Sequence, residues 1–144
     1  MNHQQMWEAY CKTAKHDGGY SAWAFGEKAD TLAQLVLAGI KTGTASLQLW
    51  YEDEKEHFPA AGEYSIVLDS REEAVCIIRT TKVYTVPFSE VNEEHAFREG
   101  EGDRSLAYWR RVHKRFFSEE LKKEGLAFDP QMLVVCEEFE NVFP

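Results

Sequence analysis

The sequence predicts an α+β fold, a small and mostly antiparallel β-barrel with flanking helices on its outside. Apolar residues recur at three- and four-residue spacing early in the chain and again near residue 110, which is typical of amphipathic helices. The middle and the end of the chain are instead rich in β-branched and aromatic residues, which suit strands. Helices and strands do not alternate regularly, so a doubly wound parallel sheet is disfavoured.

The first two helices are predicted before any long strand. Residues 3–15 have helical spacing, and the HDGG segment of residues 16–19 ends that helix. Residues 31–38 form a second, short helix, with Asp30 as its N-cap and Gly39 in the left-handed conformation after its end.

Four strands are predicted from composition. Residues 63–69 and 74–86 form a hairpin, because the polar segment 69–73 fits the loop between them. Residues 131–139 form a third strand, and residues 44–50 form a fourth.

Two further helices separate these strands. Residues 87–98 start a helix with Ser89 as N-cap, and residues 103–123 form the longest helix, capped by Asp103. The apolar stripe of this longest helix consists of Leu106, Trp109, Val112, His113, Phe116, Phe117 and Leu121.

Length and composition predict one globular unit. The chain has 144 residues, 44% of them hydrophobic and 28% charged, which is near the globular average. It has neither an internal repeat nor a linker-like stretch. We therefore expect an N-terminal helix (residues 1–19) that packs on one domain (residues 20–144).

The charge distribution restricts the partners. The net charge of −9 argues against broad binding of polyanions, so extended duplex DNA is not an expected partner. Residues 103–117, however, contain five basic side chains and one acid, a local charge of +4. This uneven charge distribution is compatible with a small ligand that reaches one basic cleft. Such a ligand is a small nucleotide or nucleoside, or a short piece of RNA.

Other features predict a cytoplasmic protein without a membrane, metal or cofactor. The N-terminus lacks the apolar core of a signal peptide, and no run of residues is long and apolar enough to span a membrane. Cys11, Cys76 and Cys136 lie too far apart for a C-x-x-C motif. His95 and Glu99 fall on one helix face, but the sequence suggests no third metal ligand.

Residues 39–46, GIKTGTAS, place one cation and three hydroxyl groups between a helix and a strand. The polar side chains are Lys41, Thr42, Thr44 and Ser46. The glycines are misplaced for a phosphate loop, and the segment follows a helix where a phosphate loop precedes one. The segment is therefore either part of a ligand site or a solvated turn.

Two other clusters are candidates for ligand binding. Residues 94–105 alternate acids with Arg98 and Arg104, which indicates either specific pairing or an exposed acidic loop. Trp23 and Phe25 stand beside a glycine and either stack on a nucleobase or pack in the core.

Taken together, these segments resemble the bacterial ASCH-domain (activating signal cointegrator homology) proteins over roughly residues 20–140. The resemblance is carried by WAFG, GIKTGTAS, PAAGEYSIVLD, HAFREGEGDRSLAYWRRVHKRFF and MLVVCEEF. It implies a PUA-like β-barrel and binding of RNA or nucleotides. Some members hydrolyse the amide of N4-acetylcytidine, and some are reported as ribonucleases.

The resemblance to the amidohydrolase members implies a catalytic set of Lys41, Thr44 and Glu99. These residues match a Lys-x-x-Thr pair and a glutamate that follows a His-Ala pair. In this hypothesis Thr44 attacks an acyl carbon, Lys41 handles its proton, Glu99 orients or shuttles, and backbone amides of the turn hold the oxyanion. Ser46 stands where those members tend to carry an arginine, so the substrate is not implied. In a ribonuclease, Lys41 would instead neutralise the scissile phosphate.

In the competing hypothesis the protein binds a ligand without breaking a bond. Lysine and arginine contact phosphate, an aromatic ring stacks on a base, and Glu99 or Asp103 reads the amino edge of a base such as cytosine. A third possibility is a protein-interaction role for the helix of residues 103–123. The predicted binding residues are Trp23, Phe25, Thr42, Ser46, Asp103, Arg104 and Arg110.

Overall fold

The structure is a computed structural model that describes residues 1–52 and 57–144. The α-helices of this described part are α1 (His3–Ala14), α2 (Ala29–Leu37), α3 (Glu93–Glu99) and α4 (Leu106–Lys123). Its strands are β1 (Ser21–Ala24), β2 (Gly43–Leu47), β3 (Tyr64–Leu68), β4 (Ala74–Pro87) and β5 (Leu133–Phe143). Two short 3₁₀ helices, Gln48–Tyr51 and Phe88–Glu90, follow β2 and β4.

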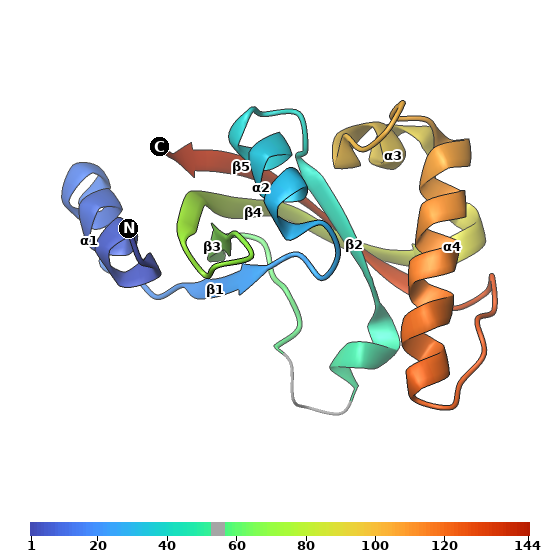
Figure 1. Cartoon of the computed structure of the whole chain (residues 1–144). Helices are drawn as coiled ribbons and strands as arrows, with labels where there is room; N and C mark the ends of the chain where they lie inside the picture. Colours follow the sequence, from blue (N-terminus) through green and yellow to red (C-terminus); the bar gives the residue numbers. More distant parts are fainter. Residues whose placement is uncertain (53–56) are drawn as a thin grey trace.

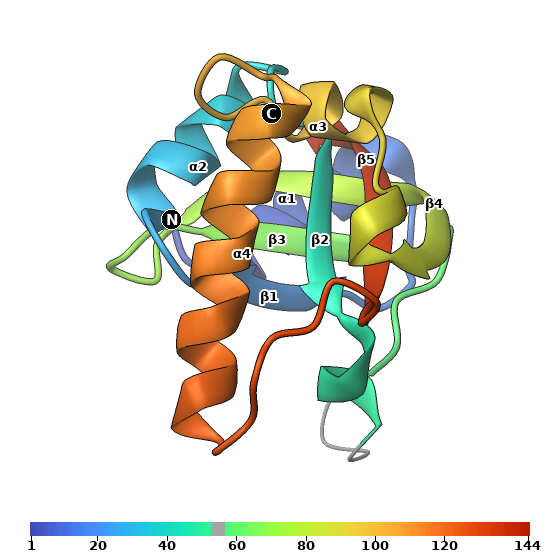
Figure 2. The same cartoon turned by 90° about the vertical axis from the view of Figure 1, so that its right-hand side faces the viewer.

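The five strands form one curled sheet in the order β1-β3-β4-β5-β2. β1 pairs with β3 in parallel, and the other three pairings are antiparallel. The predicted α+β fold is thus confirmed, and so is the hairpin of β3 and β4. The sheet is a half-barrel, because the edge strands β1 and β2 are not paired with each other, and β2 crosses in front of the other strands (Figure 2).

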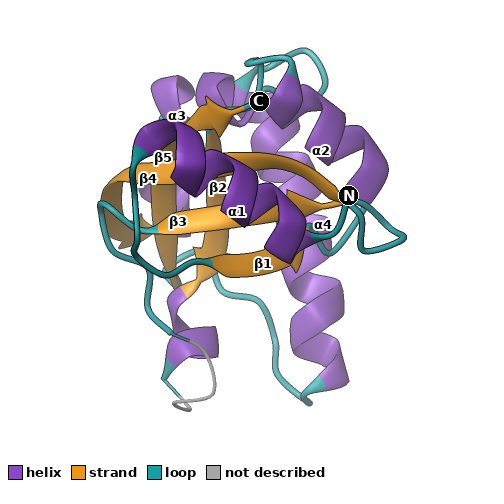
Figure 3. Ribbon diagram, turned by 90° about the vertical axis from the view of Figure 1, so that its left-hand side faces the viewer, coloured by secondary structure: helices purple, strands orange, loops and turns teal. Residues whose placement is uncertain are grey.

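Each helix packs its apolar face against the sheet. α1 lies against one end of the sheet, where Met6 and Trp7 contact the cluster around Ile66 and Ile77 (Figures 1 and 3). α2 packs on β3 and β4, and α3 and α4 share a third apolar cluster with β2 and β5. The site described below lies where these last helices meet β2. Within the described parts of the chain, no helix is both long and apolar enough to cross a lipid bilayer.

Two of the predicted helix caps are wrong. Asp30 does not cap α2; its carboxylate accepts hydrogen bonds from the backbone amide and the hydroxyl of Ser70. Asp103 does not cap α4, which begins three residues later. Ser105 is its N-cap and accepts from the Tyr108 amide, while Asp103 accepts from the Ser105 amide.

The segment after β4 also differs from the prediction. A 3₁₀ turn follows β4 directly, and α3 begins only at residue 93, so its N-cap is Asn92 and not Ser89. The Asn92 side chain accepts from the backbone amide of His95. The predicted strand 44–50 is shorter than expected, since β2 ends at Leu47. β1 was not predicted as a strand, because four residues are too few for a period to emerge.

Candidate functional site

Lys41 is buried and lies in the turn between α2 and β2, where the backbone amides of residues 40–42 all donate hydrogen bonds. As predicted, Gly39 is left-handed (φ 77°) and follows the end of α2. The amides of residues 40 and 41 donate to the Leu35 carbonyl, and the Thr42 amide donates to the Arg98 carbonyl. These amides therefore have no N–H left for an oxyanion, and that part of the sequence hypothesis is wrong for residues 40–42.

Glu99 reaches Lys41 because α3 ends in a glycine. Gly100 caps α3 in the left-handed conformation (φ 73°), which glycine adopts without strain. A Cβ at this position would lie only 2.6 Å from the Ile40 carbonyl oxygen. Gly100 thus allows the end of α3 to pack directly against the turn that holds Lys41.

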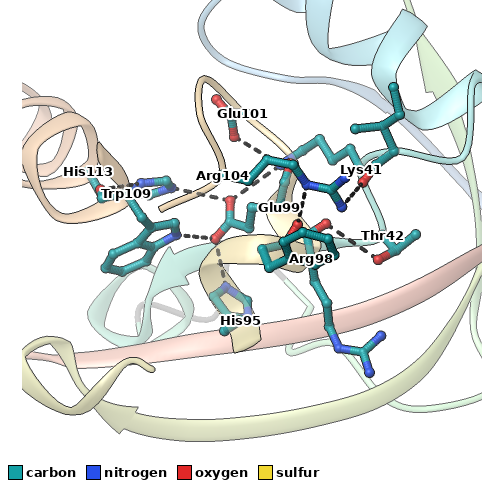
Figure 4. A network of polar contacts seen from close by, with 11 residues as sticks. Lys41, Thr42, His95, Arg98, Glu99, Glu101, Arg104, Trp109 and His113 are labelled. Carbon is teal, nitrogen blue, oxygen red and sulfur yellow. Dashed lines mark hydrogen bonds and ion pairs between the residues drawn. The ribbon is translucent and has the colours of Figure 1, made fainter. Parts of the chain in front are cut away.

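Lys41 and two glutamates form the centre of a buried polar network (Figure 4). The Lys41 ammonium donates to Glu99 Oε1 (3.3 Å), to the Glu99 carbonyl (3.3 Å) and to Glu101 Oε2 (3.1 Å). The side chains of Lys41 and Glu99 are 1% and 2% exposed, whereas Glu101 is 18% exposed. A charged pair this deeply buried must be fully hydrogen-bonded to be tolerated.

Glu99 receives further donors on both carboxylate oxygens. His95 Nε2 and Trp109 Nε1 donate to Oε2, at 2.7 and 2.5 Å, and His113 Nε2 lies 3.3 Å from Oε1. Burial by itself would raise the pKa of Glu99, but the charges of His113 and Lys41 and the histidine hydrogen bonds hold that pKa well below its usual range. Glu99 is therefore a carboxylate whose bonding capacity is used within the protein.

His113 is part of this network and not only a core residue of the α4 stripe. Its ring stacks on Trp109 at 4.2 Å, and its Nδ1 donates to the Trp109 carbonyl (2.9 Å). With Nδ1 carrying a proton, Nε2 also needs one to bond to the Glu99 carboxylate. Burial would lower the pKa of His113, but Glu99 and Glu101 raise it above its ordinary value.

Glu99, Glu101 and His113 also form a group that could ligate a metal. Their ligand atoms lie within 4.8 Å of one another, and carboxylate and imidazole suit a divalent ion. The Lys41 ammonium, however, already bridges the two carboxylates. It supplies the positive charge that a metal would supply there, so this donor set does not fit an additional cation. The absence of a metal stays a prediction.

A small cavity opens against this network. It has a volume of about 130 Å³ and is lined by the three predicted catalytic residues, Lys41, Thr44 and Glu99. Phe25 covers it, with the Lys41 ammonium 5.3 Å from the centre of its ring. The structure thus brings the predicted catalytic set to one cavity. Sequence reasoning missed His113, which also lines it; the histidine's place in an apolar stripe favoured a core role.

A larger cavity of about 480 Å³ lies between the edge strands β1 and β2. Trp23 and Phe25 form an aromatic wall, with their ring centres 5.1 Å apart and nearly perpendicular. The two cavities adjoin at four shared lining residues, Phe25, Gly26, Thr44 and Ala45. The other residues of the larger cavity are Ser21, Ala24, Ser46, Tyr51, His57, Pro59, Glu63, Ser65, Thr80 and Glu137.

Four predicted binding residues do not line either cavity. The Thr42 hydroxyl donates to the Arg98 carbonyl, and Asp103 bonds to the start of α4. Arg104 donates to the carbonyls of residues 97 and 40, and Arg110 donates to that of residue 89. The sequence predicts one cleft, but the structure has two adjoining cavities. These four residues form hydrogen bonds in the segments around the cavities.

A curled, mostly antiparallel half-barrel with cavities at its edge strands places the protein among the PUA-like α+β domains. The chain belongs to the ASCH domain family, whose profile matches residues 21–143. This finding confirms the resemblance drawn from the sequence motifs.

Solved structures agree with this assignment. An ASCH domain from Lactobacillus crispatus JV V101 is 34% identical with a TM-score of 0.90, over 98% of this chain and 94% of that one. A protein from Enterococcus faecalis V583 is 40% identical with a TM-score of 0.89, over 97% and 87% of the two chains. A hypothetical protein, PH0355, is 19% identical with a TM-score of 0.54 and shares the fold alone. No curated protein matches the chain significantly.

Proposed function

We propose that this domain binds a nucleoside-sized ligand, as a free nucleoside or nucleotide or as the end of an RNA, in the cavity between β1 and β2. The observation that carries this proposal is the cavity itself, because its volume of about 480 Å³ lies within the range of small-molecule sites. One wall is aromatic, with Trp23 and Phe25, and the interior carries hydroxyl groups. This combination suits a flat heterocycle with a polar sugar.

The charges favour recognition of the base and the sugar over recognition of the phosphate. The Lys41 ammonium already bonds to two carboxylates, and Arg104 and Arg110 are engaged with carbonyl groups outside the cavities. Few phosphate contacts imply weak dependence of affinity on salt. The expected ligand is therefore a nucleoside unit, not a long polyanion.

Calorimetric titration with nucleosides tests this function. We expect Trp23→Ala to weaken binding about 5- to 150-fold, since stacking of one base on an aromatic ring contributes about 1–3 kcal/mol. Trp23→Phe is the matched control and should retain most of the affinity. If the wild-type chain bound none of cytidine, uridine, adenosine and guanosine, the proposed function would be wrong.

A second candidate function is amide hydrolysis, and one observation favours it. Thr44 lines both cavities, while Lys41 and Glu99 line only the smaller one. A base in the larger cavity would thus place an acyl substituent beside Thr44. The threonine hydroxyl would attack the acyl carbon to form an ester, and its proton would pass to the leaving nitrogen. Water would then hydrolyse the ester, releasing the acid and restoring Thr44.

Turnover of N4-acetylcytidine, followed by separation of cytidine and acetate, tests this second candidate. We expect Thr44→Ala to lose the activity and Thr44→Ser to retain part of it. Thr42→Val is the matched control, because its hydroxyl lies on the same turn but outside both cavities. Full activity in Thr44→Ala would contradict this mechanism and would leave the binding proposal untouched.

A further inference from the structure

Glu137 in β5 is a carboxyl group that the sequence did not single out. It lines the larger cavity, and the backbone register pairs it with Thr44 of β2, which lines the same cavity. The Glu137 side chain has no hydrogen bond or ion pair with any residue in the described ranges 1–52 and 57–144. A half-buried carboxyl group without a protein partner is available to a ligand, and so is its negative charge when it ionises.

The charges that line the two cavities differ. The larger cavity has two glutamates, Glu63 and Glu137, and no lysine or arginine among the described residues. Glu63 is engaged, because it bonds to His57 (2.6 Å) and accepts from the Ala60 amide (2.6 Å), so Glu137 is the carboxyl group without a counter-charge. The smaller cavity is instead lined by three cations and three acids, which are Lys28, Lys41, Arg115, Glu27, Glu99 and Glu101. A positively charged group of a ligand is therefore matched by the larger cavity.

Trp23 adds an aromatic ring to the same cavity. It lies in β1 at one edge of the sheet, whereas Glu137 lies in β5, next to the other edge strand, β2. The Phe25 ring already has the Lys41 ammonium 5.3 Å from its centre, but no cation of the described chain lies over the Trp23 ring. The indole ring attracts a cation more strongly than the other aromatic side chains do. A base in this cavity thus meets an electron-rich ring from one strand and a free carboxyl group from another.

We propose that the larger cavity selects a nucleoside whose base carries a positive charge. Two kinds of base have this chemistry: one methylated on a ring nitrogen, as in 1-methyladenosine, and a pyridinium, as in nicotinamide riboside. In both, the charge is spread over a flat ring, so the ring that stacks on Trp23 also attracts the Glu137 carboxylate. This attraction depends on the charge of the base and not on the order of its hydrogen-bond donors and acceptors. The assignment rests on the proposed nucleoside-binding function and names the class of base that the cavity takes.

The surroundings of Glu137 couple such a ligand to pH. Burial raises the pKa of Glu137 to about 7, and the negative charges of Glu63 and Glu99 add to the shift. The other titratable groups that line the cavity are Tyr51 and His57. A bound cation opposes the shift, so its binding near neutral pH releases a proton from Glu137. The preference for a charged base should therefore be weaker at pH 5.5 than at pH 8, and a proton taken up by His57 would act in the same direction.

Calorimetric titration of the full chain with two matched pairs of nucleosides tests this inference. Nicotinamide riboside and benzamide riboside differ in one ring atom, a charged nitrogen in place of a neutral carbon. 1-Methyladenosine and N6-methyladenosine carry the same methyl group at different positions, and only the first is a cation at pH 7. A cation over an aromatic ring together with an ion pair corresponds to about 3- to 150-fold tighter binding. We expect wild type to prefer the charged member within that range, and the pair with the larger preference shows whether the ligand is a pyridinium or a methylated base.

Glu137→Gln removes the negative charge and keeps the size of the side chain. This variant should lose most of the preference at pH 8 while it still binds the neutral members of both pairs. Glu140→Gln, on the same strand but outside both cavities, is the matched control and should behave like wild type. Wild-type titrations with the two ribosides at pH 5.5 and pH 8 decide the question even if Glu137→Gln fails to fold, because the pyridinium is charged at both pH values.

The outcomes for the charged base and for nucleoside binding can be told apart. Equal binding of charged and neutral members by wild type would overturn the inference while nucleoside binding stands. An unchanged preference in folded Glu137→Gln, or a wild-type preference that does not fall at pH 5.5, would overturn it in the same way. Failure of every nucleoside to bind, charged and neutral, would overturn the proposed function as well.

Discussion

Glu99 and Glu137 are two glutamates that line adjoining cavities of one small domain, yet their environments are opposite. Lys41, His95, Trp109 and His113 contact the carboxylate of Glu99, whereas the Glu137 side chain has no hydrogen bond or ion pair with the part of the chain that the structure describes. The first carboxyl is held charged, and the second is held near its neutral form.

This difference distinguishes a buried carboxyl group that stabilises the fold from one that is available to bind a ligand. A buried carboxylate with every oxygen paired is inseparable from the packing of the residues around it. A buried carboxyl without a partner makes folding less favourable once it ionises, and it regains that energy only when a ligand supplies the missing hydrogen bonds. Glu99 therefore holds the residues of the site together, whereas Glu137 faces the cavity that a ligand would occupy.

The largest expected effect comes from removing Glu99. Glu99→Ala leaves the Lys41 ammonium and His113 buried without their main counter-charge, which typically costs about 3–5 kcal/mol of unfolding free energy. Urea denaturation followed by circular dichroism measures this loss. Glu101→Ala is the matched control and should cost less, because Glu101 is partly exposed and contacts only Lys41 within this network. Equal losses in both variants would contradict the central place given to Glu99.

The meeting of Lys41 with Glu99 was predictable, and the role of Glu137 was not. The Lys-x-x-Thr and His-Ala motifs resemble the enzymatic ASCH members closely enough to place Lys41, Thr44 and Glu99 together. The segment MLVVCEEF, by contrast, carries two successive glutamates, and successive residues of a strand point to opposite faces. Only the register between β5 and β2 shows that Glu137 faces the cavity, while Glu138 lies 3.6 Å from Arg98.

The helix caps and the arginines show a second limit of prediction from the sequence. Asp103 and Ser105 are both good N-cap residues two positions apart, so composition alone could not choose between them. The sequence predicts that Arg104 and Arg110 contact phosphate, because both side chains are cationic. In the structure they donate to backbone carbonyls, and those acceptors come from segments brought together only by tertiary packing.

The second prediction reverses the sign of the first. The folded pKa of Glu137, about 7, lies above its ordinary value of 4.5, so its contribution to stability is full below pH 4.5 and is lost as the pH rises through 7. Glu137→Gln removes this loss and should stabilise the protein by roughly 1–3 kcal/mol at pH 8, with a smaller gain at pH 5. Urea titrations at the two pH values measure it. Destabilisation at pH 8 would show that Glu137 has a protein partner, and exposed Glu140→Gln should change little.

The third prediction concerns the titration of His113. Its pKa is raised, so its contribution to stability is complete below the ordinary histidine pKa of about 6.5 and is lost as the pH rises through the folded value. NMR titration of the imidazole signals should place this pKa above about 6.5. Glu99→Gln should lower it, because Glu99 supplies the main negative charge beside the ring, and Glu101→Gln should lower it less. A wild-type value below 6.5 would contradict the charge pairing with Glu99.

The smallest expected effect separates two arginines of one helix. Arg115 lines the smaller cavity and lies 3.7 Å from Glu27, whereas Arg110 points to the Ser89 carbonyl and lines neither cavity. If a nucleotide places its phosphate at the mouth of the smaller cavity, Arg115→Ala should reduce the advantage of cytidine monophosphate over cytidine by no more than about fivefold, since exposed ion pairs contribute up to about 1 kcal/mol. Arg110→Ala should leave both affinities unchanged and should alter the unfolding free energy by less than about 0.5 kcal/mol. Equal effects of the two substitutions would instead indicate that phosphate contacts extend along the whole basic face of α4. Arg110 would then be a ligand-binding residue and not only a residue that stabilises the fold around the cavities.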